Sequence, residues 1–243
     1  MLRRSLSLPA LALTLALALP AVAQEAAIRK NLSDRLPNLP KIDEVSKTPI
    51  AGIWEVRIGS DVLYTDEQGN HLIQGTVFDT QAKVNLTEKR IEKLTAIDFA
   101  ELPLKDAMVV KQGNGKRKLA VFADPNCGYC KRFERDLLNV KDVTVYTFLY
   151  PILGPDSTDK SRDIWCAKDA QKTWRAWMID GSLPQRVTAA CDTKALDRNT
   201  AFGRKYRVNG TPALIFEDGK RIPGAMSTAD IEKNLEQAKA GKS

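Results

Sequence analysis

The sequence predicts two folded units, a small α+β unit built on an antiparallel sheet and a larger α/β domain. Two observations support this. Between residues 41 and 78, short segments with strand-like composition alternate with turn residues, as in an antiparallel sheet. From residue 105 onward, segments whose apolar residues recur every second position alternate with segments whose apolar residues recur with a helical period. The resulting strand-helix-strand order implies a pair of parallel strands joined by a crossover.

The first residues have the pattern of an export signal. Arg3 and Arg4 precede an apolar stretch at residues 6–19, and Ala21-Val22-Ala23 has the small-x-small form of a signal-peptidase site. At about 14 residues, against about 20 for a bilayer, the stretch is too short to span a membrane. We therefore expect a signal peptide at residues 1–23 and an exported product without membrane insertion, in a compartment where disulfides persist.

Residues 24–85 form the predicted first unit, a helix followed by strands. A unit of this size is marginally stable alone, and an exposed sheet edge would offer a partner surface. The helix is expected at 26–36, ended by Pro37, and the strands at 41–47, 52–58, 62–65 and 71–78.

Residues 86–104 are predicted to be a linker helix running to about residue 99. Thr87 is its expected N-cap, and charged residues outnumber apolar ones, as in a connector partly in solvent.

Residues 105–243 form the predicted second domain. A mostly helical insertion at about 158–206 holds Trp165, Trp174 and Trp177, which we assign to its core rather than to a peptide-binding surface. Strands are expected at 107–111, 118–123 and 143–150, a helix at 128–138, a hairpin at 212–222 and a final helix after the capping box at 227–230.

The charge of the chain argues against nucleic-acid binding, and its single histidine indicates no functional site. The formal net charge is +7, and about +5 without Arg3 and Arg4, which is not the charge of a nucleic-acid-binding protein. The densest basic cluster, Lys111 with residues 116–118, flanks Gly113-Asn114-Gly115 and predicts a solvated hairpin turn. His71 has no partner cluster and is given no role.

The motif Cys127-Gly128-Tyr129-Cys130 follows an apolar strand and opens an amphipathic helix. Two thiols at this spacing can close and reopen a disulfide, and a helix N-terminus favours the thiolate at Cys127. Disulfide exchange needs an exposed attacking thiolate, here Cys127, and a second thiol that releases the mixed disulfide, here the shielded Cys130. Gly128 and Tyr129 are expected to allow close approach and to adjust thiolate stability. The motif therefore predicts thiol-disulfide chemistry.

The other two cysteines, Cys166 and Cys191, are expected to form a structural disulfide closing a loop of about 25 residues. A zinc site built from all four cysteines is disfavoured, because structural zinc sites usually supply two close-spaced pairs. We therefore expect no metal and no separate cofactor, since the Cys127 and Cys130 pair carries the redox chemistry itself.

Three further residues are candidate supports for the site. Thr211 and Pro212 precede an apolar strand, and a cis bond there would let the Thr211 backbone pair with an extended substrate beside Cys127. Asp124 would either assist proton transfer from Cys130 or act as a helix cap or solvated charge.

Several of these segments together resemble a known family. They are residues 122–130, the Gly210-Thr-Pro-Ala213 segment, the spaced Cys166 and Cys191, and upstream residues 62–65 and 71–75. They are similar to the DsbC/DsbG family of bacterial periplasmic thiol:disulfide interchange proteins. The glycine after Cys127 favours the DsbC branch, since DsbG usually has proline there. The insertion is slightly longer between its cysteines than the family pattern, a difference that concerns local geometry rather than the class of chemistry.

The resemblance implies a periplasmic homodimer. Its N-terminal domains would be cystatin-like dimerisation domains, and its C-terminal domains thioredoxin-like with a helical insertion. It also implies isomerase and reductase activity on misoxidised or unfolded exported proteins, chaperone activity, and reduction by a membrane thiol reductase of the DsbD type. The alternatives are a DsbG-like reductase that protects single cysteines from sulfenylation and a holdase chaperone with a secondary redox role. A monomeric oxidase is a further alternative.

Overall fold

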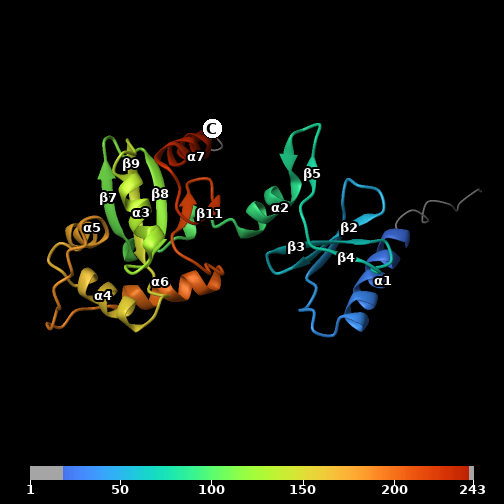
Figure 1. The fold of residues 1–243 in the computed structure, drawn as a ribbon, viewed down its shortest axis with the longest axis horizontal. Coiled ribbons are helices and arrows are strands. Elements are labelled where there is room, and N and C mark those ends of the chain that lie inside the picture. The colour runs from blue at the N-terminus through green and yellow to red at the C-terminus, as the bar shows by residue number, and fades with distance from the viewer. Residues whose placement is uncertain (1–18, 241–243) are drawn as a thin grey trace, which may run out of the picture. The chain divides into compact units, whose positions relative to one another are not determined.

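The computed structural model describes residues 19–240 and divides the chain into two compact units, one ending at Leu94 and the other beginning at Thr95 (Figure 1). Among these residues, no helix combines the length and the apolarity needed to cross a membrane. The predicted signal peptide lies outside the described residues except for positions 19–23, which form the start of the first helix.

The first unit contains one helix and a four-stranded antiparallel sheet in the order β1-β2-β3-β4. Ile28 and Leu32, one helical turn apart, pack on Trp54 and Val56, which alternate along one strand and face the same side. The elements are α1 (Leu19–Arg35), β1 (Glu44–Lys47), β2 (Ile53–Ile58), β3 (Asp61–Asp66), β4 (Leu72–Ile73) and the two-stranded ribbon β5 (Phe78–Asp79) and β6 (Val84–Asn85).

Three predictions for this part of the chain are wrong. The single strand expected at 71–78 is two short ones, because β4 pairs with β3 whereas β5 pairs with β6. The linker helix α2 (Leu86–Thr95) is not capped by Thr87, which is buried and accepts a hydrogen bond from the Val77 N–H. Asn85 Oδ1 instead accepts from the Glu88 N–H at 3.0 Å. The helix ends earlier than expected.

Arg90 fastens α2 to the first sheet. Its guanidinium contacts Glu55 and Glu44, each at 2.8 Å. The chain then makes two 3₁₀ turns, Phe99–Glu101 and Leu104–Asp106, which belong to the second unit.

The second unit is a five-stranded sheet in the order β11-β10-β8-β9-β7, in which β8 and β9 are parallel as predicted. Its strands are β7 (Met108–Gln112), β8 (Arg117–Ala123), β9 (Val143–Leu149), β10 (Ala213–Phe216) and β11 (Arg221–Pro223). Its helices are α3 (Gly128–Leu137), α4 (Pro155–Trp165), α5 (Ala170–Arg175), a π-helical turn (Ala176–Asp180), α6 (Lys194–Lys205) and α7 (Thr228–Ala240).

Alternation along β8 divides the core between the two faces of this sheet. Leu119 and Val121 point into a cluster with Phe133 of α3 and Leu235 of α7. Phe122, one position on, points to the other face, where it stacks on Phe148 and on Phe202 of α6. The strand that leads to the cysteine motif is therefore buried on both sides, which holds its end rigidly.

The predicted hairpin at the basic cluster is wrong. β7 pairs with β9 rather than with β8, so residues 113–116 connect strands that are not neighbours. Arg117 is also not solvated, because it is 9% exposed and contacts Glu232 at 2.6 Å and Glu236 at 2.8 Å on α7.

Candidate active site

The cysteine motif lies at the junction of β8 and α3. The strand ends at Ala123, a short turn follows, and Cys127 is the N-cap of α3. Its Sγ accepts a hydrogen bond from the Cys130 N–H at 3.3 Å, one of the donors that a helix leaves unpaired in its first turn. Both thiols are free, so the structure shows the reduced pair.

Cys127 is less exposed than the sequence predicted. Its exposed fraction is 5%, against 1% for Cys130. The segment that contains Thr211 and Pro212 lies against the Cys127 thiol. These two residues are joined by a cis peptide bond, and the Thr211 carbonyl accepts a hydrogen bond from the Cys127 thiol at 3.1 Å. Tertiary structure thus brings together two motifs 84 positions apart and partly covers the thiol.

The two residues between the cysteines are open to solvent. Tyr129 is 68% exposed, and a Cβ built on Gly128 would meet no atom within 4 Å. The chain's own packing therefore does not require glycine at position 128. The open space lies at the residue that directly follows Cys127.

The environments of the two thiols push their pKa values in opposite directions. The largest influence on the pKa of Cys127 is a hydrogen bond from the Cys130 side chain. The Thr211 side chain and backbone N–H groups add further hydrogen bonds. Together these bonds outweigh the effect of burial and lower the pKa of Cys127 from 9.0 to about 6. Burial is the largest influence on Cys130 and raises the pKa of its thiol far above the usual range. At neutral pH the site therefore holds a thiolate beside a protonated thiol.

Asp124 is buried, with no exposed surface, and is neither a helix cap nor a solvated charge. Its Oδ1 accepts from the Asn126 N–H and the Ser157 hydroxyl, at 2.8 and 2.7 Å. Its Oδ2 accepts from the N–H groups of Ile152 and Leu153, at 2.8 and 3.0 Å. Two of these bonds tie the turn before Cys127 to the loop after β9, one ties it to α4 and one lies within the turn, so the contacts of this carboxylate are those of a structural support.

Two tryptophans of the insertion also hold the site, and the sequence did not reveal it. Trp177 Nε1 donates to the Pro125 carbonyl at 2.6 Å, in the turn before Cys127. Trp174, 3% exposed, donates to the Glu134 carboxylate of α3 at 2.7 Å, and burial raises the pKa of Glu134. Nothing in the local sequence marks these pairings, because each joins residues at least 40 positions apart.

The remaining cysteines are joined to each other. Cys166, at the end of α4, and Cys191, just before α6, form a disulfide 25 positions apart with a Cα–Cα distance of 5.9 Å. Over residues 19–240, no group of three or more His, Cys, Asp or Glu side chains is arranged to hold a metal ion.

Comparisons with known proteins agree with this geometry. Residues 20–88 match the family described as the disulfide bond isomerase protein N-terminal domain, and residues 104–239 match the thioredoxin-like domain. A crystal structure of a disulfide interchange protein from Neisseria gonorrhoeae is 37% identical, with a TM-score of 0.52 over 56% of this chain and 98% of that one.

Two curated relatives extend the similarity over most of the chain. The probable thiol:disulfide interchange protein DsbC of Bordetella pertussis is 44% identical over 212 residues, 87% of this chain and 74% of the relative. The thiol:disulfide interchange protein DsbC of Escherichia coli is 32% identical over 224 residues, 89% of each chain. This chain, an α+β protein with a thioredoxin-like domain, therefore belongs to the DsbC family of thiol:disulfide interchange proteins.

Proposed function

We propose that this thiol-disulfide oxidoreductase is a periplasmic isomerase and reductase that rearranges incorrect disulfides in exported proteins. The observation that carries the proposal is the opposed pKa values of the reduced pair, about 6 for Cys127 and strongly raised for Cys130. The two thiols carry out the exchange themselves and supply electrons only when a client disulfide is reduced, so we assign no separate cofactor.

The first step is attack by the Cys127 thiolate on one sulfur of a client disulfide. A bond forms between Cys127 and that sulfur, the client's disulfide breaks, and its second sulfur leaves as a thiolate. If that thiolate or another client thiolate attacks elsewhere in the client, a new pairing forms and Cys127 is finally expelled as a thiolate. The pair then remains reduced, and the net reaction is isomerisation.

Reduction is the alternative exit. Cys130 loses its proton and attacks Cys127, the mixed disulfide breaks, and the client leaves with a thiol while the pair becomes a disulfide. Because burial holds the pKa of Cys130 high, this exit is slowed and the client has time to try another pairing. A pair oxidised in this way needs an external thiol reductant, which we assign to a membrane reductase of the DsbD type.

We assign three positioning roles around the pair. The Thr211 carbonyl, beside Pro212, orients the Cys127 thiol, and Asp124 fixes the preceding turn. Gly128 and Tyr129 form the exposed face that meets the client. The disulfide between Cys166 and Cys191 has a structural role in the insertion.

We further propose that the protein acts as a homodimer joined through its N-terminal units. The match of residues 20–88 to an isomerase N-terminal domain supports this, as does the open edge of β1 in the first sheet. Two sites that face one bound chain raise the effective concentration of thiolate around it. Such a dimer would also hold unfolded clients as a chaperone.

Refolding of a scrambled multi-disulfide protein tests the isomerase function. The reduced protein is expected to restore client activity faster than an equal concentration of small thiol, and Cys127→Ala is expected to abolish that gain. Cys127→Ala should still suppress client aggregation if the chaperone activity is separate. No gain over the small thiol would contradict the isomerase proposal, and greater activity on sulfenylated single-cysteine proteins would favour the reductase alternative.

A further inference from the structure

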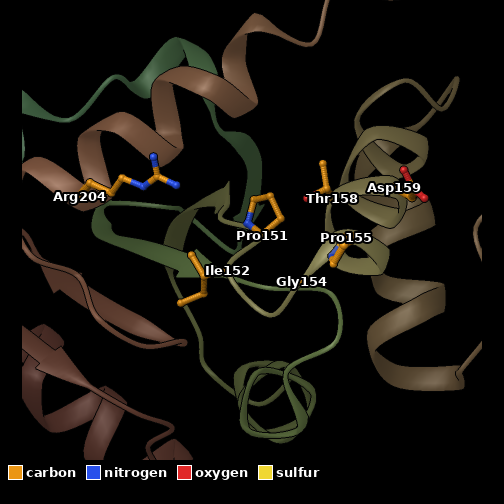
Figure 2. A pocket seen from close by; sticks show the side chains of 7 residues that line it. All are labelled: Pro151, Ile152, Gly154, Pro155, Thr158, Asp159 and Arg204. Carbon is orange, nitrogen blue, oxygen red and sulfur yellow. The ribbon is translucent and has the colours of Figure 1, made fainter.

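A shallow pocket of about 510 Å³ lies on the second unit, at the loop that follows β9 (Figure 2). Its walls come from the loop after β9, the first turns of α4 and the last turn of α6. The lining residues are Pro151, Ile152, Gly154, Pro155, Thr158, Asp159 and Arg204.

Hydrogen bonds join this pocket directly to the cysteine turn. The Ile152 N–H, in the pocket wall, donates to Asp124, three positions before Cys127. Asn126, the neighbour of Cys127, donates through its side-chain amide to Asp156 at 2.7 Å and Ser157 at 3.0 Å, in the first turn of α4. An extended chain advances about 3.3 Å per residue, so residues two or three positions from a client cysteine bonded to Cys127 extend about 7–10 Å from it. This reach defines which client residues a subsite beside the cysteine turn would contact.

The pocket has an apolar floor and one free cation. Pro151, Ile152 and Pro155 supply the apolar surface, and Ile152 is 36% exposed. Figure 2 shows the Arg204 guanidinium extending from α6 toward Pro151, and the Asp159 carboxylate on the opposite side, turned away from it. Over the described part of the chain, Arg204 forms no ion pair and no side-chain hydrogen bond; its one electrostatic neighbour is the Tyr150 ring hydroxyl.

We infer that this pocket is a client subsite that accepts the residues flanking the client cysteine, and that Arg204 favours client segments carrying a carboxylate there. The inference rests on the proposed function, because the client reaches the pocket only while it is bonded to Cys127. The apolar floor takes the adjacent side chain, and the planar guanidinium pairs with the carboxylate. Because Arg204 is exposed, the preference is modest and weakens with salt.

Two matched disulfide peptides test the subsite. They have the same length and the same apolar residue next to cysteine, and differ only in Glu or Gln at positions two and three from it. The rate constant for attack by the reduced full-length protein is measured for each peptide. We expect the Glu peptide to react about two- to fivefold faster, with the ratio close to one at 1 M salt. Arg204→Gln should bring the ratio close to one at low salt, and Arg204→Glu should reverse it.

Arg135→Glu is the matched control, because Arg135 is an exposed residue of α3 that does not line the pocket. It makes the same change in net charge and should leave the peptide ratio as in the wild type. The neutral 2-hydroxyethyl disulfide should react equally with all four proteins. An unchanged ratio in both Arg204 variants, or an equal loss in Arg135→Glu, overturns the subsite. Failure of the wild type to reduce even the neutral disulfide overturns the proposed function, and the subsite with it.

Discussion

At the residue scale, the reactivity assigned to Cys127 depends on groups from two parts of the chain. The Cys130 thiol and N–H come from the same helix, and the Thr211 side chain comes from the segment before β10. Each stabilises negative charge on Sγ, whereas burial opposes it. The lowered pKa of Cys127 stabilises the reduced pair relative to its disulfide. The disulfide form of the site is therefore a better electron acceptor.

The pKa of Cys127 predicts a specific pH profile for alkylation. The rate of reaction of the reduced protein with iodoacetamide at Cys127 should rise with pH and level off, with a midpoint near 6 instead of 9.0. Cys130→Ala removes the largest stabilising hydrogen bond and should move the midpoint toward 9.0. Cys130→Ser keeps a hydroxyl donor and should move it less. Identical midpoints in the wild type and Cys130→Ala would contradict this account.

Asp124 leads to a prediction about stability. Asp124→Ala leaves four donors around a buried site without their acceptor. We expect the free energy of unfolding in urea to fall by about 3 kcal/mol. Asp218→Ala is the control, because Asp218 is exposed and accepts one bond from the Lys220 N–H; it should cost less than about 1 kcal/mol. Equal effects of the two substitutions would be evidence against a structural role for Asp124.

At the scale of elements, the helical insertion supports the redox helix rather than only decorating the sheet. Trp174 and Trp177, from α5 and the π-helical turn, donate to groups in α3 and in the turn before Cys127. The disulfide between Cys166 and Cys191 links the end of α4 to the start of α6 across this segment. Stability of the insertion and geometry of the site are therefore connected.

Removing this disulfide tests how much the bridge stabilises the second unit. For a loop of 25 residues, chain entropy gives a loss of about 3 to 4 kcal/mol in the free energy of unfolding of the Cys166→Ser and Cys191→Ser double variant. Guanidinium unfolding of the oxidised proteins measures it. The folded variant should still react with 2-hydroxyethyl disulfide at the wild-type rate, since neither cysteine touches the reacting sulfurs. A loss below about 1 kcal/mol would contradict a stabilising role for the bridge.

At the scale of the whole molecule, the first unit is the smaller of the two and carries an open sheet edge at β1. A small unit buries a low fraction of its surface, so association is an effective way to stabilise it. The proposed dimer therefore has a physical reason independent of family membership.

Sedimentation of the exported chain at micromolar concentration measures the dimer directly. We expect a mass of twice the chain, together with a thermal midpoint that rises with protein concentration, because dissociation accompanies unfolding. Cys127→Ala serves as the control: it should sediment in the same way, since the thiol takes no part in association. A monomer with a concentration-independent midpoint would rule the dimer out.

The sequence by itself determined the features that depend on local periodicity and spacing. These are the buried strand before the cysteine motif, the helix that Cys127 caps and the parallel crossover. The strand and the helix depend on residues within a few positions of one another, and the parallel pairing follows from the strand-helix-strand order of these elements.

Only the tertiary structure decided features that join distant residues. In the folded chain, β9 lies between β7 and β8, and Arg117 is buried against α7. The Thr211 segment contacts Cys127, and Asp124 accepts hydrogen bonds from the loop at residues 152–153. Strand order and buried polar pairs depend on which surfaces meet once the chain is folded, and short-range patterns do not encode that choice. The presence of a thiol pair is thus local, whereas its ionisation and its access are properties of the assembled fold.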